Sequence, residues 1–227
     1  MRWRTGLGVL AGAALVAAAV LYVGADRPAP IDFVDALTGP ETTLDIPFDR
    51  FHLSPEGLVR SMSLSASGDD RPLVRTLSSG YLTRDFVFEV EIAIPADASD
   101  LAFVGFGSVA SAPPYNEPCD AWVFRVHHLP ETHKVQFGGC QLVQSKGGAS
   151  HVVLETLGEF PASGTLTVQL ERAGEQLTAR LPGDPGTART FRMSEFPAVL
   201  THGVGYLFFG NSSVGTSFRN VKVRPRT

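Results

Sequence analysis

The sequence predicts an all-β fold, a two-sheet antiparallel sandwich preceded by one N-terminal hydrophobic export helix. The chain of 227 residues contains 23 Gly and 16 Pro, so turn-forming residues interrupt it too often for a helical bundle. Apolar and polar residues alternate with a period of two in several segments that turn signals separate. We find no internal repeat of 20 to 50 residues, which argues against a propeller or a solenoid.

The export helix is predicted at residues 5–25, an uncharged apolar run that follows Arg2 and Arg4. A helix of that length reaches roughly 30 Å, enough to span a bilayer, and this favours an uncleaved anchor. Small residues at Gly24 and Ala25 would also suit a signal peptidase, so cleavage near Ala25 stays open. Residues 1–25 are therefore a signal peptide or a signal anchor. In both cases the two arginines stay inside and the remainder is exported.

The charge of the chain limits its partners. Its formal charge is −4 and its pI about 5.8, with scattered basic residues, so no nucleic-acid partner is expected. Frequent Ala and Arg with only three Lys suggest a GC-rich bacterium. We expect a periplasmic, secreted or outward-facing membrane-anchored protein that contacts the membrane only through its N-terminal helix.

The strongest strand pattern lies at residues 86–94. Apolar side chains occupy every second position there, whereas Glu89 and Glu91 fall on the opposite face and Pro95 ends the strand. Further strands are expected at residues 101–106, 151–157, 166–170, 177–181, 204–209 and 218–223. Residues 193–200 are the best candidate for a short helix. Residues 26–46 read as a spacer and edge segment, and residues 47–227 as the sandwich.

A β-hairpin is predicted around a turn at residues 129–132, because apolar residues alternate on both sides of it. One register places Trp122 opposite Phe137 and Phe124 opposite Val135. Trp122 should then point into the core.

The same register places Cys119 opposite Cys140, the only two cysteines of the chain. An oxidising compartment makes a disulfide between them the first expectation. The register also sets Arg125 opposite Lys134, a like-charge pair that an anionic or hydroxyl-rich partner would relieve.

Several motifs carry a family resemblance. They are the strand start Gly80-Tyr81 with residues 85–91, the hairpin of residues 164–168 and 176–181, and the closing segments at residues 203–206 and 217–223. In order and spacing they resemble the concanavalin A-like lectin/glucanase jelly roll, in particular its 3-keto-disaccharide hydrolase-like and laminin G-like (LamG-like) domains. The resemblance runs from about Phe51 to Arg224. It implies a carbohydrate-associated, sometimes calcium-binding sandwich.

The acidic residues on the wet face of the strongest strand do not form a catalytic set. Glycoside cleavage needs two carboxylates flanking one bond, and Glu89 and Glu91 lie about 7 Å apart. Glucanase-type members of the resembled family carry Glu-x-Asp-x-Glu, and here Val87 or Ala93 breaks any such frame. We therefore expect a solvated strand face and no catalytic residues. A glycoside-acting hydrolase using Glu89, Glu91 or Glu117 remains the alternative.

Metal sites are weakly indicated. Three histidines cluster near the hairpin turn and are expected to be exposed turn residues: His127, His128 and His133. Strand geometry puts Cys119 roughly 26 Å from His127, which excludes a joint zinc site. No resident cofactor is expected; calcium would suit the compartment, with paired acids as donors at Asp97 and Asp100, or at Asp69 and Asp70.

The most informative segment for function is the loop at residues 108–118, which the disulfide would anchor. Tyr115 could stack on an apolar sugar face, and polar side chains beside it and on the adjoining sheet could bind hydroxyls. The expected ligand-binding set is Tyr115, Asn116, Glu117, Asp120, Arg125 and Gln136. The sequence thus favours an exported binding or interaction module for carbohydrate or another envelope component. A purely structural envelope domain is a further alternative.

Overall fold

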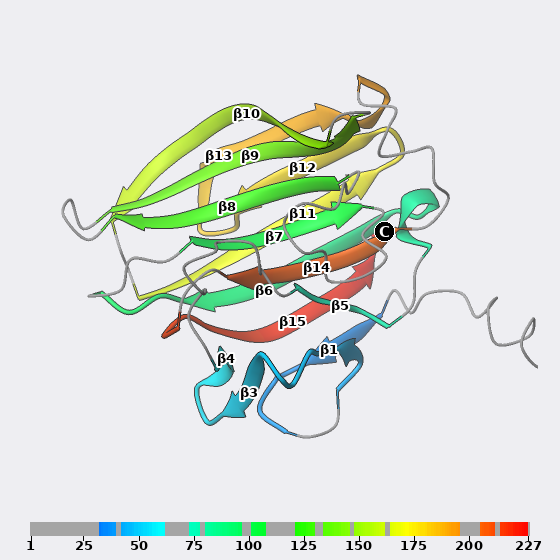
Figure 1. The fold of residues 1–227 in the computed structure, drawn as a ribbon. Helices are drawn as coiled ribbons and strands as arrows, with labels where there is room; N and C mark the ends of the chain where they lie inside the picture. Colours follow the sequence, from blue (N-terminus) through cyan, green and yellow to red (C-terminus); the bar gives the residue numbers. More distant parts are fainter. Residues whose placement is uncertain are drawn as a thin grey trace, which may run out of the picture.

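The computed structural model describes residues 32–39, 42–61, 73–77, 80–96, 101–107, 121–129, 134–145, 148–161, 164–195, 205–211 and 214–226. Two antiparallel sheets lie face to face (Figure 1), which confirms the predicted all-β jelly-roll sandwich. The predicted export helix lies outside the described residues. Within the described ranges, no helix has the length and apolar character needed to cross a membrane.

The larger sheet has eight strands. Its order is β13 (Asp184–Arg192), β12 (Gln176–Leu181), β11 (Thr165–Ala173), β6 (Phe86–Ala93), β15 (Ser217–Pro225), β4 (Gly57–Arg60) and β3 (Phe51–Ser54), and β1 (Phe33–Asp35) also pairs with β15. The second sheet has seven strands. Its order is β10 (Gly148–Pro161), β9 (Lys134–Ser145), β8 (Ala121–Leu129), β7 (Leu101–Gly107), β14 (Tyr206–Asn211), β5 (Leu73–Thr76) and β2 (Leu44–Asp45).

Two short 3₁₀ turns complete the described elements, η1 (Tyr81–Thr83) and η2 (Met193–Glu195). The second begins where a short helix was predicted, and the rest of that prediction, residues 196–200, lies outside the described part.

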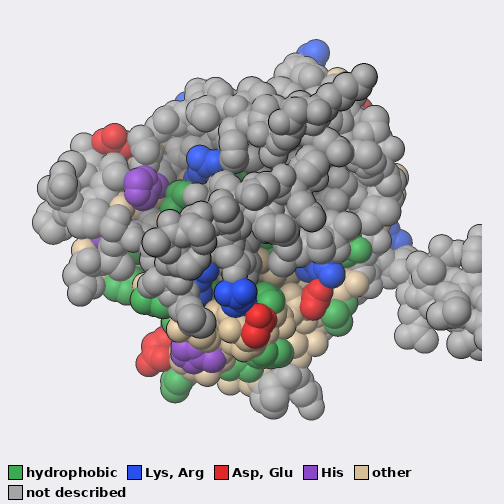
Figure 2. All heavy atoms as spheres, in the orientation of Figure 1, with side chains coloured by type: hydrophobic (Ala, Val, Ile, Leu, Met, Phe, Trp, Pro, Cys, Tyr) green, Lys and Arg blue, Asp and Glu red, His purple; other side chains and the backbone are tan. Residues whose placement is uncertain are grey.

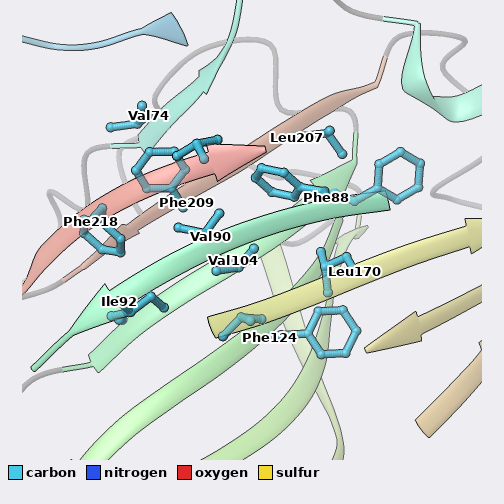
Figure 3. Close-up of a cluster of buried hydrophobic side chains, with 14 of the residues drawn as sticks. Val74, Phe88, Val90, Ile92, Val104, Phe124, Leu170, Leu207, Phe209 and Phe218 are labelled. Carbon is cyan, nitrogen blue, oxygen red and sulfur yellow. The ribbon is translucent and has the colours of Figure 1, made fainter. Parts of the chain in front are cut away.

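The core lies between the sheets and follows the period-two pattern. Burial alternates strictly along β6, as predicted, because successive side chains of a strand point to opposite faces. Figure 3 shows apolar side chains of both sheets meeting in this layer. The rings of Phe209 and Phe218, one from each sheet, are 5.0 Å apart. Trp122 is fully buried, as predicted, and its ring centre lies 5.0 Å from that of Phe191.

Asp35 ties the N-terminal segment to the sandwich. This carboxylate is 6% exposed and accepts hydrogen bonds from the backbone of Leu37 at 2.9 Å and of Thr43 at 2.9 Å. It also accepts one from Thr42 Oγ1 at 2.7 Å. Since a buried carboxylate is costly unless it is hydrogen-bonded, these contacts fix the turn between β1 and β2. The part of residues 26–46 that the structure describes, expected as a spacer and edge segment, therefore supplies a strand to each sheet.

The β8–β9 hairpin exists, but its predicted register is wrong. Trp122 lies opposite Gln141 and Phe124 opposite Gly139, a shift of four residues from the expected pairing. An even shift keeps every side chain on its predicted face, so the alternation of apolar residues cannot distinguish the two registers. The ladder ends at the pair of Leu129 and Lys134, so residues 130–133 connect the two strands.

The shift removes two consequences of the expected register. Arg125 lies opposite Gly138, so the predicted like-charge pair with Lys134 does not form. Cys140 lies opposite Val123, and Cys119 is outside the described residues. The disulfide thus remains a prediction that rests on the expected oxidising compartment alone.

Candidate functional site

The candidate site is the outer face of the seven-stranded sheet, the face turned away from the core. The pairing of β5, β14, β7 and β8 sets Arg75, Phe208, Gly105 and Val123 in one row across this face. The next row contains Phe103 and Arg125. Residues from four strands far apart in the sequence are thereby brought together on one surface.

The centre of this outer face is apolar. Phe208 is 1% exposed and Phe103 is 5% exposed, although both alternate with residues that enter the core. A Cβ atom at Gly105 would lie 2.2 Å from Cε2 and Cζ of Phe208. The phenyl ring therefore covers Gly105 at a distance that no larger residue would allow.

A polar group borders this apolar centre at the β5 side. Arg75 binds Oδ2 of Asp45 through Nε at 2.9 Å and Nη2 at 2.8 Å. Its guanidinium carbon also lies 5.0 Å from the centre of the half-buried Tyr206 ring. Ion pair and cation–π contact together hold Arg75 and Tyr206 in a fixed arrangement. No local sequence pattern indicates this group, because its strands are only two to six residues long and β5 pairs with β14 across more than 100 positions.

A second polar group lies on β8. Arg125 and His127 are two residues apart and half-buried, and both face away from the core. Figure 2 shows Lys/Arg and His side chains that reach the surface on this side of the molecule. Phe103 and Gly138 are the register neighbours of Arg125, and position 138 offers no side chain beside its guanidinium.

The predicted ligand-binding residues can be only partly placed. Arg125 lies on the outer face, and Gln136 is the register partner of His127 in β9. The side chain of Gln136 is not described. Tyr115, Asn116, Glu117 and Asp120 lie outside the described residues.

Glu89 and Glu91 lie on the outer face of the other, eight-stranded sheet. Glu89 accepts hydrogen bonds from Gln169 Nε2 at 2.5 Å and from Arg224 Nη2 at 2.6 Å. Glu91 binds the Arg219 guanidinium and accepts a hydrogen bond from Asn220 Nδ2 at 2.9 Å.

The partners of Glu91 favour its ionised form. Partial burial alone would raise the pKa of Glu91, but the hydrogen bonds of Asn220 and Arg219 and the charges of Arg219 and Lys222 outweigh it and lower that pKa. A general acid needs the opposite shift. The side chains are only 13% and 19% exposed, so the expectation of a solvated acidic face is wrong. The carboxylates are ion-paired instead.

The described residues contain no group of three His, Cys, Asp or Glu that could hold a metal. His128 is 1% exposed and faces the core, which contradicts its predicted exposure in a turn, because β8 extends to Leu129. His127 is half-buried on the opposite face. The remaining candidates for a metal site lie outside the described residues. They are His133 and the acids considered for calcium, Asp69, Asp70, Asp97 and Asp100.

Comparison with known proteins identifies the fold. No family model matches the sequence, and no curated protein matches it. The Crh5 transglycosylase in complex with NAG aligns with a TM-score of 0.56 and 12% identity over 89% of this chain and 87% of its own. A β-glucanase of Bacillus licheniformis aligns with a TM-score of 0.52 and 14% identity over 87% and 99%. An alginate lyase of Pseudomonas aeruginosa aligns with a TM-score of 0.50 and 15% identity over 78% of this chain and 86% of its own. The chain therefore has the jelly-roll sandwich fold of these proteins, as its motifs predicted.

Proposed function

We propose that this protein is an exported carbohydrate-binding module whose ligand lies on the outer face of the seven-stranded sheet. The fold supports the ligand class, since the similar structures include a transglycosylase, a glucanase and an alginate lyase. Because one fold can carry unrelated functions, the fold alone does not identify the ligand, and the residues of the site must do so. Residues 1–25 would provide the export signal or anchor.

The observation that carries the proposal is the pair of polar groups on one face of the sheet. Arg75 with Tyr206, and Arg125 with His127, lie half-buried on either side of the rings of Phe103 and Phe208, which are themselves buried and give the face a rigid base. Ligand sites typically place a few oriented hydrogen-bonding groups on a pre-formed surface. A sugar matches this chemistry, because its hydroxyls can pair with guanidinium, phenol and imidazole groups.

The arrangement is also preorganised. Arg75 is held by Asp45 and by the Tyr206 ring, so little side-chain entropy is lost when a ligand binds there. The predicted Tyr115 loop would extend the same surface, since it joins β7 to β8.

Binding is favoured over hydrolysis by the state of the acidic residues. Glu89 and Glu91 are each engaged by an arginine, on the sheet opposite the proposed ligand face. Neither is placed as a proton donor next to a nucleophile, which glycoside cleavage requires.

A glycan array probed with the full-length protein, with and without calcium, tests the proposal. We expect binding to a defined set of oligosaccharides and no release of reducing ends from the bound glycan. Binding to none of the glycans would contradict the proposed function. Release of reducing ends that Glu89→Gln abolishes would instead establish the hydrolase alternative.

A further inference from the structure

A hollow of about 490 Å³ opens at one end of the eight-stranded sheet, on the other sheet from the proposed carbohydrate face. It lies where β4, β6 and β15 meet. The residues that line it are Glu56, Val59, Ala93, Ile94, Pro95, Ala96, Gly164, Gly215, Ser217 and Arg219. Its volume falls within the range of small-molecule sites, roughly 300 to 1,000 Å³.

The wall of the hollow is apolar and is kept open by glycines. Gly164 and Gly215 have φ angles of +82° and +104°, in the region that disfavours other residues. A Cβ atom at Gly164 would meet nothing within 4 Å. The backbone N–H of Ile94 donates to the carbonyl oxygen of Gly164 at 3.2 Å and fixes this wall. Together with Pro95, these residues leave a fixed apolar surface facing open space.

Arg219 is the positively charged residue in the lining, and it is held in place. A bulge in β15 separates the register positions of Arg219 and Lys222, with Asn220 in the left-handed region at φ 50°. The bulge directs Arg219 and Asn220 onto the two oxygens of Glu91.

The rest of this guanidinium is available to a ligand. Arg219 binds Glu91 through Nε, and across the described part of the chain it has no other hydrogen-bond partner. Its Nη1 and Nη2 groups can therefore take a carboxylate in the two-pronged geometry that arginine favours.

Ser217 is the hydroxyl-bearing residue of the lining. It is 6% exposed, lies on the outer face between Val59 and Ala93, and lines the hollow. No hydrogen bond of its hydroxyl occurs among the described residues, and its oxygen is not one of the buried atoms left without a partner, so the hydroxyl is open to solvent. It can therefore exchange hydrogen bonds with a ligand hydroxyl in the hollow. Glu56 lies at the rim and accepts a hydrogen bond from Ser54 through Oε2, which leaves Oε1 for another hydroxyl.

We propose that this hollow binds a hexuronate, a sugar unit that carries a carboxylate. The carboxylate binds Nη1 and Nη2 of Arg219, the hydroxyls bind Ser217 and Glu56, and the apolar ring face packs on Pro95. Glu56 repels both anions alike but accepts hydrogen bonds only from the sugar hydroxyls, so these hydroxyls distinguish a uronate from a small carboxylate. This site is separate from the proposed carbohydrate face and does not depend on that proposal.

Calorimetric titration of the full-length protein with D-glucuronate tests the ligand class, with glucose and acetate as comparisons. We expect glucuronate to bind at least tenfold more tightly than glucose, which lacks the carboxylate, and than acetate, which lacks the sugar ring and its hydroxyls. Absence of glucuronate binding at millimolar concentration would overturn the proposal. Equal binding of acetate would overturn the assignment to a sugar.

Variants test the location. Arg219→Gln should weaken glucuronate binding at least tenfold. Arg224→Gln is the matched control, because it removes a comparable ion pair, with Glu89, from the same strand and face. Ala93→Ile fills the hollow while keeping the Arg219–Glu91 pair, and it should also abolish binding. This variant tests the location even if Arg219→Gln fails to fold. Unchanged affinity in a folded Ala93→Ile protein would overturn the proposed location.

The outcome is separable from the proposed function. Arg125→Ala lies on the other sheet and should leave glucuronate affinity unchanged here. A negative glycan array would contradict the carbohydrate face alone, whereas a loss of glucuronate binding in Arg125→Ala would show that the uronate binds there and not in the hollow.

Discussion

Replacing Gly105 by alanine should destabilise the protein although only one methyl group is added. The new Cβ atom would lie 2.2 Å from Cε2 and Cζ of Phe208 and 2.8 Å from the carbonyl oxygen of Trp122. Ordinary contacts are about 3.5 to 4 Å, so the ring must move by more than 1 Å. Phe208 is 1% exposed and has little free space into which to move.

The cost can be estimated from the behaviour of overpacked interiors. Inserting a methyl group into a well-packed region costs typically about 1 to 3 kcal/mol. For a domain of this size, 1 kcal/mol corresponds to roughly 2 to 4 °C in melting temperature, so Gly105→Ala should lower it by about 2 to 12 °C. Gly183→Ala is the control, because a Cβ atom there meets nothing within 4 Å.

Calorimetric melting of the two variants checks this estimate. The double variant Gly105→Ala with Phe208→Leu should be less destabilised than the sum of its single changes, because the smaller side chain removes the clash. An unchanged melting temperature for Gly105→Ala would refute the placement of Phe208 across the sheet. Additive effects in the double variant would refute the clash as its cause.

Three further predictions follow from the paired acids and from the expected loop. Glu91→Gln should reduce stability to urea at pH 7. The difference from the unmodified protein should shrink as the pH falls below 4.5, the ordinary pKa of a glutamate, because a lowered carboxylate pKa stabilises the fold only while the group is ionised. An equal difference at pH 7 and pH 3 would contradict the ion pair. Alkylation of the exported protein under non-reducing conditions should leave Cys119 and Cys140 unmodified, with the disulfide contributing about 3 kcal/mol, and free thiols would disprove the pairing. Tyr115→Ala should weaken glycan binding by about 1 kcal/mol or more at a nearly constant melting temperature, whereas unaltered affinity would exclude this residue from the site.

The strand pattern was readable from the sequence because burial leaves a local trace. Along residues 86–93 each buried side chain alternates with a partly exposed one, and the same period marks β12. The strand β13 was missed because Asp184, Pro185 and Gly186 at its start read as a turn. The pairing of Asp184 and of residues 189–192 with β12 supplies what local propensity does not.

The register and the site could not be read in the same way. The alternation around Trp122 is satisfied equally by registers that differ by an even number of residues, so only the turn decides. Arg75 and Tyr206 come together because β14 lies between β5 and β7, an order that no local pattern encodes. The partners of Glu89 and Glu91 likewise come from strands that are 80 or more positions away.

The affinity of the glycan selected on the array, measured for four proteins, tests the central claim most directly. The proteins are the unmodified chain, Arg125→Ala, Tyr206→Ala and Arg224→Ala, where the last removes an arginine from the opposite sheet. We predict that Arg125→Ala and Tyr206→Ala each weaken binding about fivefold or more while Arg224→Ala binds normally. Normal binding by both Arg125→Ala and Tyr206→Ala would contradict the placement of the ligand on the outer face of the seven-stranded sheet.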